Sequence, residues 1–89
     1  MHRVPLKTLG DIVYAEVLRE VVRRPLDPRA GISIDEMRQS LRVLDALDAA
    51  NGTLDLEDAD YDHLKAKLLG MQWNVVDRRI LQLVDDVIN

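Results

Sequence analysis

The sequence predicts an all-α domain, a small bundle of three or four short helices. Apolar residues recur at intervals of three and four along most of the chain, which is the spacing of a helix with one buried face. Start and stop signals separate these segments. Because 89 residues leave room for one hydrophobic core, we expect a single helical domain over residues 8–89, preceded by a flexible tail over residues 1–7.

The first helix is expected to run from Thr8 to about Arg24. The hydroxyl of Thr8 is suited to an N-cap, and Asp11 would place a negative charge in the first turn, where it complements the helix dipole. Pro25 and Pro28 then stop the helix and stiffen the connector. The apolar residues at helical spacing are Leu9, Ile12, Val13, Val17, Leu18, Val21 and Val22.

The second helix has the clearest start, because residues 33–36 (Ser-Ile-Asp-Glu) match the S-x-x-E capping box. The helix is expected to fray near Ala49, after which the Asn51–Gly52 pair turns the chain. Its predicted buried stripe consists of Met37, Leu41, Leu44 and Leu47.

The third helix is expected from about Glu57 to Leu69, with Asp55 as its N-cap. A fourth segment with helical spacing begins within residues 74–77 and continues to the end of the chain. The sequence leaves open whether Gly70 separates two helices or bends one long helix. The inward-facing residues of the third helix are predicted to be Tyr61, Leu64 and Leu68.

Two short segments resemble each other. Residues 32–34 and 54–56 both place an apolar-polar-apolar triplet before acidic residues. Both triplets can be explained as helix entries with similar capping chemistry. They can also be explained as a minimal two-stranded ribbon in which one triplet pairs with the other.

The most distinctive feature of the sequence is an acidic belt without a single Lys or Arg. A surface of this kind suits a basic protein partner, and it disfavours direct binding to nucleic-acid phosphates. We expect Asp55, Asp58 and Asp62 to contact a basic patch on such a partner. The belt consists of Asp45, Asp48, Asp55, Glu57, Asp58, Asp60 and Asp62.

The sequence predicts neither a metal site nor a cofactor. An EF-hand aligned on Gly52 would place Leu47 and Ala49 at ligand positions. His63 lies near Asp60 and Asp62 in the sequence, but no second His motif completes a site. The simplest interpretation of His63 is a surface histidine whose pKa is raised by acidic neighbours.

Catalysis is not expected either. The chain has no cysteine, no glycine-rich phosphate loop and no recognisable serine, histidine and acid set. Ser33 is accounted for as a helix cap. Ser40 is expected to face solvent or to bond to the preceding helical turn. The chain is therefore predicted to bind rather than to catalyse.

Two apolar features suggest contact surfaces. Trp73, the only tryptophan, is predicted to bind a partner, although a large aromatic at a helix junction also seals a core. Ile80, Leu83 and Val87 lie at steps of three and four, which fits a seam for self-association. The same spacing fits the core face of a monomer, and both interpretations remain open.

Two alternative functions are also considered. One is an acidic inhibitor that mimics nucleic acid and occupies the groove of a host nucleic-acid-binding protein. The other is a small DNA-binding regulator related to helix-turn-helix proteins, which would use the arginines near residues 19–29 and 38–42. The acidic start of the third helix argues against the second alternative, because it would face phosphates with like charge.

Three segments carry a resemblance to a known class of proteins. Residues 34–47 (IDEMRQSLRVLDAL), 56–68 (LEDADYDHLKAKL) and 73–87 (WNVVDRRILQLVDDV) resemble small uncharacterised helical proteins encoded by tailed phages and prophages. The resemblance implies a compact accessory protein that is part of a virion or assembly complex, or that binds a host factor. We accordingly expect it in the bacterial cytoplasm or in a virion, without a membrane association.

Overall fold

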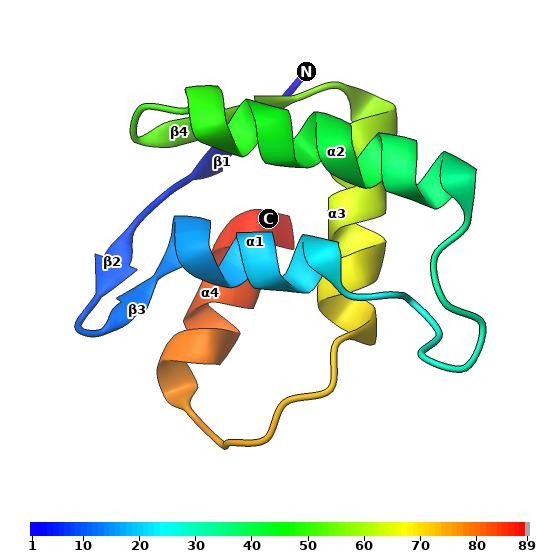
Figure 1. Cartoon of the computed structure of the whole chain (residues 1–89). Helices are drawn as coiled ribbons and strands as arrows, with labels where there is room; N and C mark the ends of the chain where they lie inside the picture. The colour runs from blue at the N-terminus through cyan, green and yellow to red at the C-terminus, as the bar shows by residue number, and fades with distance from the viewer. Residues whose placement is uncertain (89) are drawn as a thin grey trace.

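The computed structural model describes residues 1–88 of the chain. Over these residues the fold is α+β, since four helices are accompanied by two antiparallel sheets of two strands each (Figure 1). The predicted all-α fold is therefore wrong. Asn89, the last residue of the expected domain, lies outside the described residues. In chain order the elements are β1 (His2–Pro5), β2 (Thr8–Leu9), β3 (Ile12–Val13), α1 (Tyr14–Arg23), α2 (Ile34–Ala49), β4 (Thr53–Leu56), α3 (Asp58–Gly70) and α4 (Arg78–Ile88).

Strand β1 occupies the segment that the sequence predicts to be a flexible tail. It pairs antiparallel with β4, and Val4 lies opposite Leu54. Both side chains are buried, so the pairing hides apolar surface as well as satisfying backbone groups. The predicted ribbon between residues 32–34 and 54–56 is wrong, because β4 pairs with the N-terminus instead. Asp55, the expected N-cap of the third helix, lies within β4.

A hairpin of β2 and β3 replaces the predicted start of the first helix. Gly10 lies between the two strands with φ +64, a left-handed conformation that a residue with a side chain rarely adopts. A Cβ atom at this position would lie 2.9 Å from Nη1 of Arg79. Thr8 is therefore a strand residue, and the N-cap of α1 is Val13, five residues after the expected N-cap.

Helix α2 begins as predicted, but its buried face matches the predicted stripe only in part. The backbone amide of Glu36 donates to Oγ of Ser33 at 3.1 Å, which confirms Ser33 as the N-cap, while the carboxylate of Glu36 pairs with Lys67. Met37 and Leu41, however, are about half exposed, and the buried side chains are those of Ser40, Val43 and Leu47. The prediction is therefore confirmed for Leu47 and in part for Leu44, which is half-buried against the core, but it is wrong for Met37 and Leu41. Helix α2 carries apolar residues on two sides, and spacing alone cannot select between them.

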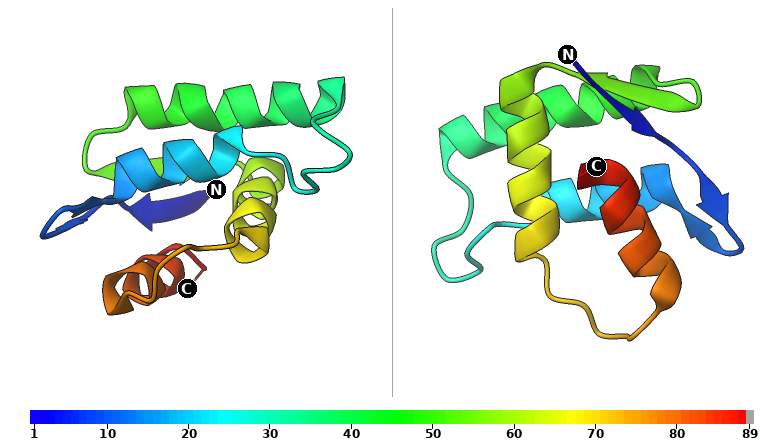
Figure 2. Two further views of the ribbon diagram at one scale, coloured as in Figure 1. Left: turned by 60° about the horizontal axis from the view of Figure 1, so that its bottom comes forward. Right: turned by 180° about the vertical axis from the view of Figure 1, so that it is seen from behind.

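Helices α3 and α4 are separate elements joined by residues 71–77, so Gly70 ends a helix rather than bending one. Tyr61, Leu64 and Leu68 of α3 are buried as predicted. Helix α2 and helix α4 lie on opposite sides of the molecule, with the core residues of α1, α3 and β4 between them (Figures 1 and 2). No helix within residues 1–88 is long and apolar enough to cross a membrane.

Candidate functional site

The acidic belt is largely neutralised by cations of the same chain. The carboxylate of Asp48 lies 2.6 Å from Arg19, and that of Asp55 lies 3.0 Å from Arg3. These pairs join segments that are distant in the sequence. The remaining pairs within 4.0 Å are Asp58 with His2 and the N-terminal amine, and Asp60 with Arg42.

The three acids predicted to bind a partner differ in their surroundings. Asp55 is engaged by Arg3 on the neighbouring strand. Asp58 is highly exposed but lies 3.1 Å from Nε2 of His2. Asp62 is exposed on α3 and has no salt bridge within the described residues. Because surface pairs already screen two of the three charges, these residues do not form one unpaired acidic patch.

A row of polar side chains is buried between α2 and α3. Oγ of Ser40 and Nε2 of His63 lie 2.9 Å apart, and both residues are buried. Burial lowers the pKa of His63 below 6.5, and the positive charge of Lys67 lowers it further. The prediction of a surface His63 with a raised pKa is therefore wrong. The prediction that Ser40 faces solvent or its own helix is also wrong.

Lys67 is the most deeply buried charged residue in this row, and no motif in the sequence marks it as a functional residue. Its ammonium lies 2.6 Å from a carboxylate oxygen of Glu36 and donates to the carbonyls of Val22 and Arg24. These carbonyls belong to the C-terminal end of α1, where a positive charge complements the helix dipole. Lys67 therefore joins α1, α2 and α3 in one polar cluster whose role is structural.

A second polar cluster fixes α4 to the rest of the domain. The hydroxyl of Tyr14 donates to Asp86 at 2.6 Å, and Lys7 lies 3.3 Å from the same carboxylate. Burial, together with this hydrogen bond, raises the pKa of Tyr14 to about 12. The hydroxyl lowers the pKa of Asp86 by stabilising its charged form. At neutral pH the Tyr14 hydroxyl is therefore protonated and the Asp86 carboxyl is ionised.

The predicted self-association residues lie on the inner face of α4. Leu83 and Val87 are part of the hydrophobic core, and Ile80 is buried beside it. Tyr61 adds to this packing by donating its hydroxyl to the backbone carbonyl of Val87 at 2.9 Å. A surface for self-association would therefore need other side chains than Leu83 and Val87.

A groove of about 580 Å³ is lined by α4 and by the connector before it. Among its lining residues, Trp73 and Val84 pack against the core, and Ile80 is buried. Val75 and Leu81 are 60% and 66% exposed, and Val76 is fully exposed. The groove is lined by Trp73, Val75, Val76, Asp77, Arg78, Ile80, Leu81 and Val84.

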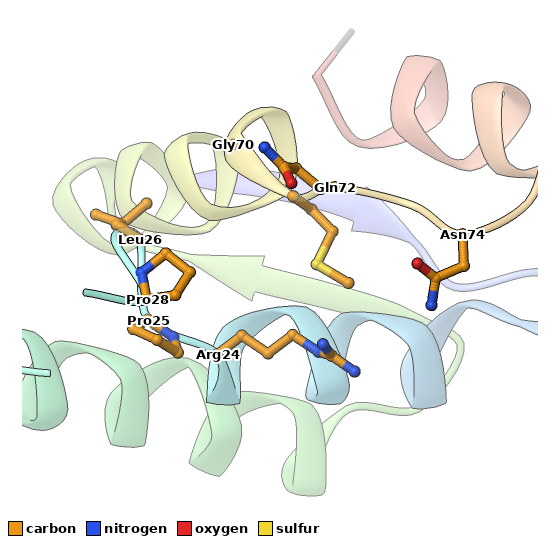
Figure 3. A pocket seen from close by; sticks show the side chains of 8 residues that line it. Arg24, Pro25, Leu26, Pro28, Gly70, Gln72 and Asn74 are labelled. Carbon is orange, nitrogen blue, oxygen red and sulfur yellow. The ribbon is translucent and has the colours of Figure 1, made fainter. Parts of the chain in front are cut away.

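A second hollow of about 400 Å³ lies between the two connectors that follow α1 and α3. Figure 3 shows that Pro25, Leu26 and Pro28 line it from one connector, while Gln72 and Asn74 line it from the other. Its lining mixes polar and apolar groups and holds no cluster of acid, base and nucleophile. Among residues 1–88, no group of three or more His, Cys, Asp or Glu side chains is arranged to hold a metal ion.

The helix connections also bear on the DNA-binding alternative. Residues 24–33 join α1 to α2, and strand β4 separates α2 from α3. Residues 71–77 join α3 to α4. A helix-turn-helix motif uses a turn of about three or four residues, and none of these connections within the described chain is that short.

Comparison with known proteins adds no family to this description. No family model matches the sequence, and neither a curated protein nor a solved structure shows significant similarity to it.

Proposed function

We propose that the chain is a non-enzymatic protein-interaction module that binds an amphipathic helix of a protein partner in the groove beside α4. The observation that supports this proposal is the gathering of exposed Val75, Val76 and Leu81 around the half-buried Trp73. Apolar side chains grouped around a hollow are typical of a binding site, whereas isolated ones are common on any surface. Trp73 would serve as the anchor, because tryptophan contributes strongly to protein interfaces.

The shape and chemistry of the groove favour a helix as the occupant. The α4 residues Ile80, Leu81 and Val84 line the groove at helical spacing, so a second helix can lie against it and insert side chains spaced three or four residues apart. Arg78 and Asp85, both exposed, lie seven residues apart on α4 and are not in salt bridges of the described residues. These opposite charges would set the direction in which the partner helix binds.

The charge of the whole chain favours a partner with a basic patch. The formal net charge is −4 at pH 7, and Asp62 and Glu57 remain exposed. The net negative charge, to which these two exposed acids contribute, would accelerate the encounter with a basic protein, while the groove would provide most of the affinity. Following the resemblance to tailed-phage and prophage proteins, we propose that the partner is a virion or assembly component or a bacterial host factor.

Capture with matched variants tests the groove. Val76→Asp and Leu81→Asp each place a charge in the groove without removing a core side chain, and Leu69→Asp is a control because Leu69 is exposed outside the groove. A partner identified from producing cells should be retained by the wild type and by the control. Its affinity should fall at least about tenfold in each groove variant.

Thermal unfolding of the three variants should be similar, because all three residues are more than half exposed. A peptide covering the partner's contact helix should then bind the isolated chain with the same dependence on Val76 and Leu81. Equal capture by the groove variants and the control would remove the groove from the proposal.

A further inference from the structure

The outer face of α2 carries apolar side chains that the domain does not cover. Ile34, Met37 and Leu41 are 62%, 46% and 51% exposed, and they lie three and four residues apart. Helix α2 is also the outermost element on its side of the molecule (Figure 2). With 16 residues it is the longest helix described, so it offers an extended surface to a partner.

Two opposite charges flank Leu41 on this face. Arg38 precedes Leu41 by three residues and Asp45 follows it by four, so all three lie on one side of the helix. Both charged residues are exposed, and no salt bridge within residues 1–88 involves either. Each copy of the face therefore presents one positive and one negative side chain, Arg38 and Asp45, that are not paired within the described part of the chain. Such a face is complementary in charge to a second copy of itself.

We infer that two copies of the chain associate through antiparallel α2 helices, with the twofold axis at Leu41. At a rise of about 1.5 Å per residue, Arg38 lies about 4.5 Å before Leu41, and Asp45 lies about 6 Å beyond it. Reversing the second helix brings Arg38 level with the partner's Asp45 to within about 1.5 Å along the axis. The symmetry forms this ion pair twice.

On the other flank of the same face, two apolar side chains are placed so that they also meet across the twofold axis. Met37 and Leu44 are also separated by seven residues, and they lie about 100° around the helix from Arg38 and Asp45. Leu44 is half-buried and packs against the core of its own domain, and in the antiparallel pair its exposed part meets Met37 of the other copy. The contact therefore has a line of apolar pairs on one flank and a line of ion pairs on the other, with Leu41 against the partner's Leu41 at the centre.

Helix α4 has a similar triplet, Arg78, Leu81 and Asp85, but its second flank does not match. There the corresponding residues are Asp77 and Val84, so an antiparallel pair would place a carboxylate against an apolar side chain. In the α2 pair a carboxylate and an apolar side chain meet only toward the ends, where Ile34 lies level with the partner's Asp48, about 10.5 Å from the axis. In the α4 pair they would meet close to the axis, and this difference favours α2 as the helix that binds the second copy. The groove beside α4 then remains free, because α2 and α4 lie on opposite sides of the molecule.

Sedimentation equilibrium of the purified full chain, from about 1 µM to about 1 mM, tests the inference. The wild type should reach a dimer in this range. Leu41→Glu should raise the dimer Kd by at least about 100-fold, because it places two carboxylates together at the axis. Arg38→Asp and Asp45→Arg should each raise it by about tenfold, since each creates two like-charge contacts.

The double variant Arg38→Asp, Asp45→Arg should return the dimer Kd to near the wild-type value, because it restores both ion pairs in reversed orientation. The control Leu81→Glu should leave the Kd unchanged. Helicity and unfolding midpoints confirm that each variant folds. A wild type that remains monomeric overturns the inference. So does a dimer that is disrupted by Leu81→Glu and not by Leu41→Glu. A double variant whose dimer Kd stays as high as that of the single charge variants also overturns it.

Discussion

At the scale of single residues, the domain depends on polar groups buried between its helices. Lys67 contacts Glu36 and two terminal carbonyls of α1, while His63 bonds to Ser40. Buried polar groups of this kind contribute little net stability when paired, but they cost much when one partner is removed. Their main effect is to fix the relative positions of α1, α2 and α3.

Replacing Lys67 tests this cluster. Lys67→Met keeps the length of the side chain but leaves the largely buried carboxylate of Glu36 without its partner, so the free energy of unfolding should fall by about 3 kcal/mol. Adding Glu36→Gln to Lys67→Met should recover part of this loss. Urea denaturation measures both effects. The control is Lys65→Met, because Lys65 is half-buried and lies outside the cluster, and it should change the free energy of unfolding by less than about 0.5 kcal/mol. Equal losses from the Lys67 and Lys65 variants would contradict the role of the cluster.

The lowered pKa of His63 predicts a dependence of stability on pH. Between its folded pKa and the unfolded value of 6.5, the unfolded chain binds more protons than the folded chain. Stability should therefore decrease as the pH falls below 6.5, and it should be unaffected by His63 above that pH. The lowered pKa values of Asp77 and Asp86 act in a separate range, near and below 3.8.

Urea unfolding midpoints measured from pH 7.5 down to about pH 5 check this dependence. The decrease should persist in His2→Gln and disappear in His63→Gln, even if the latter variant is less stable overall. If stability still decreases with falling pH in His63→Gln, the pH dependence belongs to another titrating group.

At the scale of elements, the division of α4 into an inner and an outer face is the basis of the proposed groove. Leu83 lies on the inner face and is fully buried, whereas Leu81 lies on the outer face and is mostly exposed. Leu83→Ala should cost about 3 kcal/mol of unfolding free energy, because it creates a cavity in the core. Leu81→Ala should change it by less than about 0.5 kcal/mol. Denaturant unfolding compares the two, and similar costs would mean that α4 is oriented differently.

Local signals in the sequence were sufficient for some elements. The N-cap at Ser33, the stop at Pro25 and the inward face of α3 depend on neighbouring residues, and all three predictions are confirmed. The strands were missed because β1 finds its partner some 50 residues away in β4, which no local pattern encodes. The hairpin was missed because Leu9, Ile12 and Val13 also fit helical spacing, and the left-handed Gly10 overrides that spacing.

The candidate site was predictable only in part. Trp73 and Ile80 were selected from the sequence, and the structure brings both to the same groove. Val75, Val76 and Leu81 were not selected as site residues, because their exposure depends on how α4 docks onto the core. The pairing of acidic residues with Arg3, Arg19 and Arg42 was missed for a similar reason, since each pair joins segments far apart in the sequence.

At the scale of the whole molecule, two apolar faces lie on opposite sides of one small domain. The face of α2 is suited to a second copy, and the groove beside α4 is suited to a helix of another protein. A dimer formed through α2 would display two such grooves. It would bind a partner with repeated sites more tightly than one copy does, provided that both grooves can be engaged together.

Site-specific photocrosslinking tests the central claim most directly, namely that the groove beside α4 binds another protein. A photoreactive phenylalanine analogue would replace Val76, which is fully exposed in the groove, and a matched chain would carry it at the exposed Leu69. In producing cells, irradiation should join position 76 to one partner protein, through residues on one face of a helix, and position 69 should give no such product. Products that are the same from both positions, or that contain only a second copy of the chain, would contradict the claim.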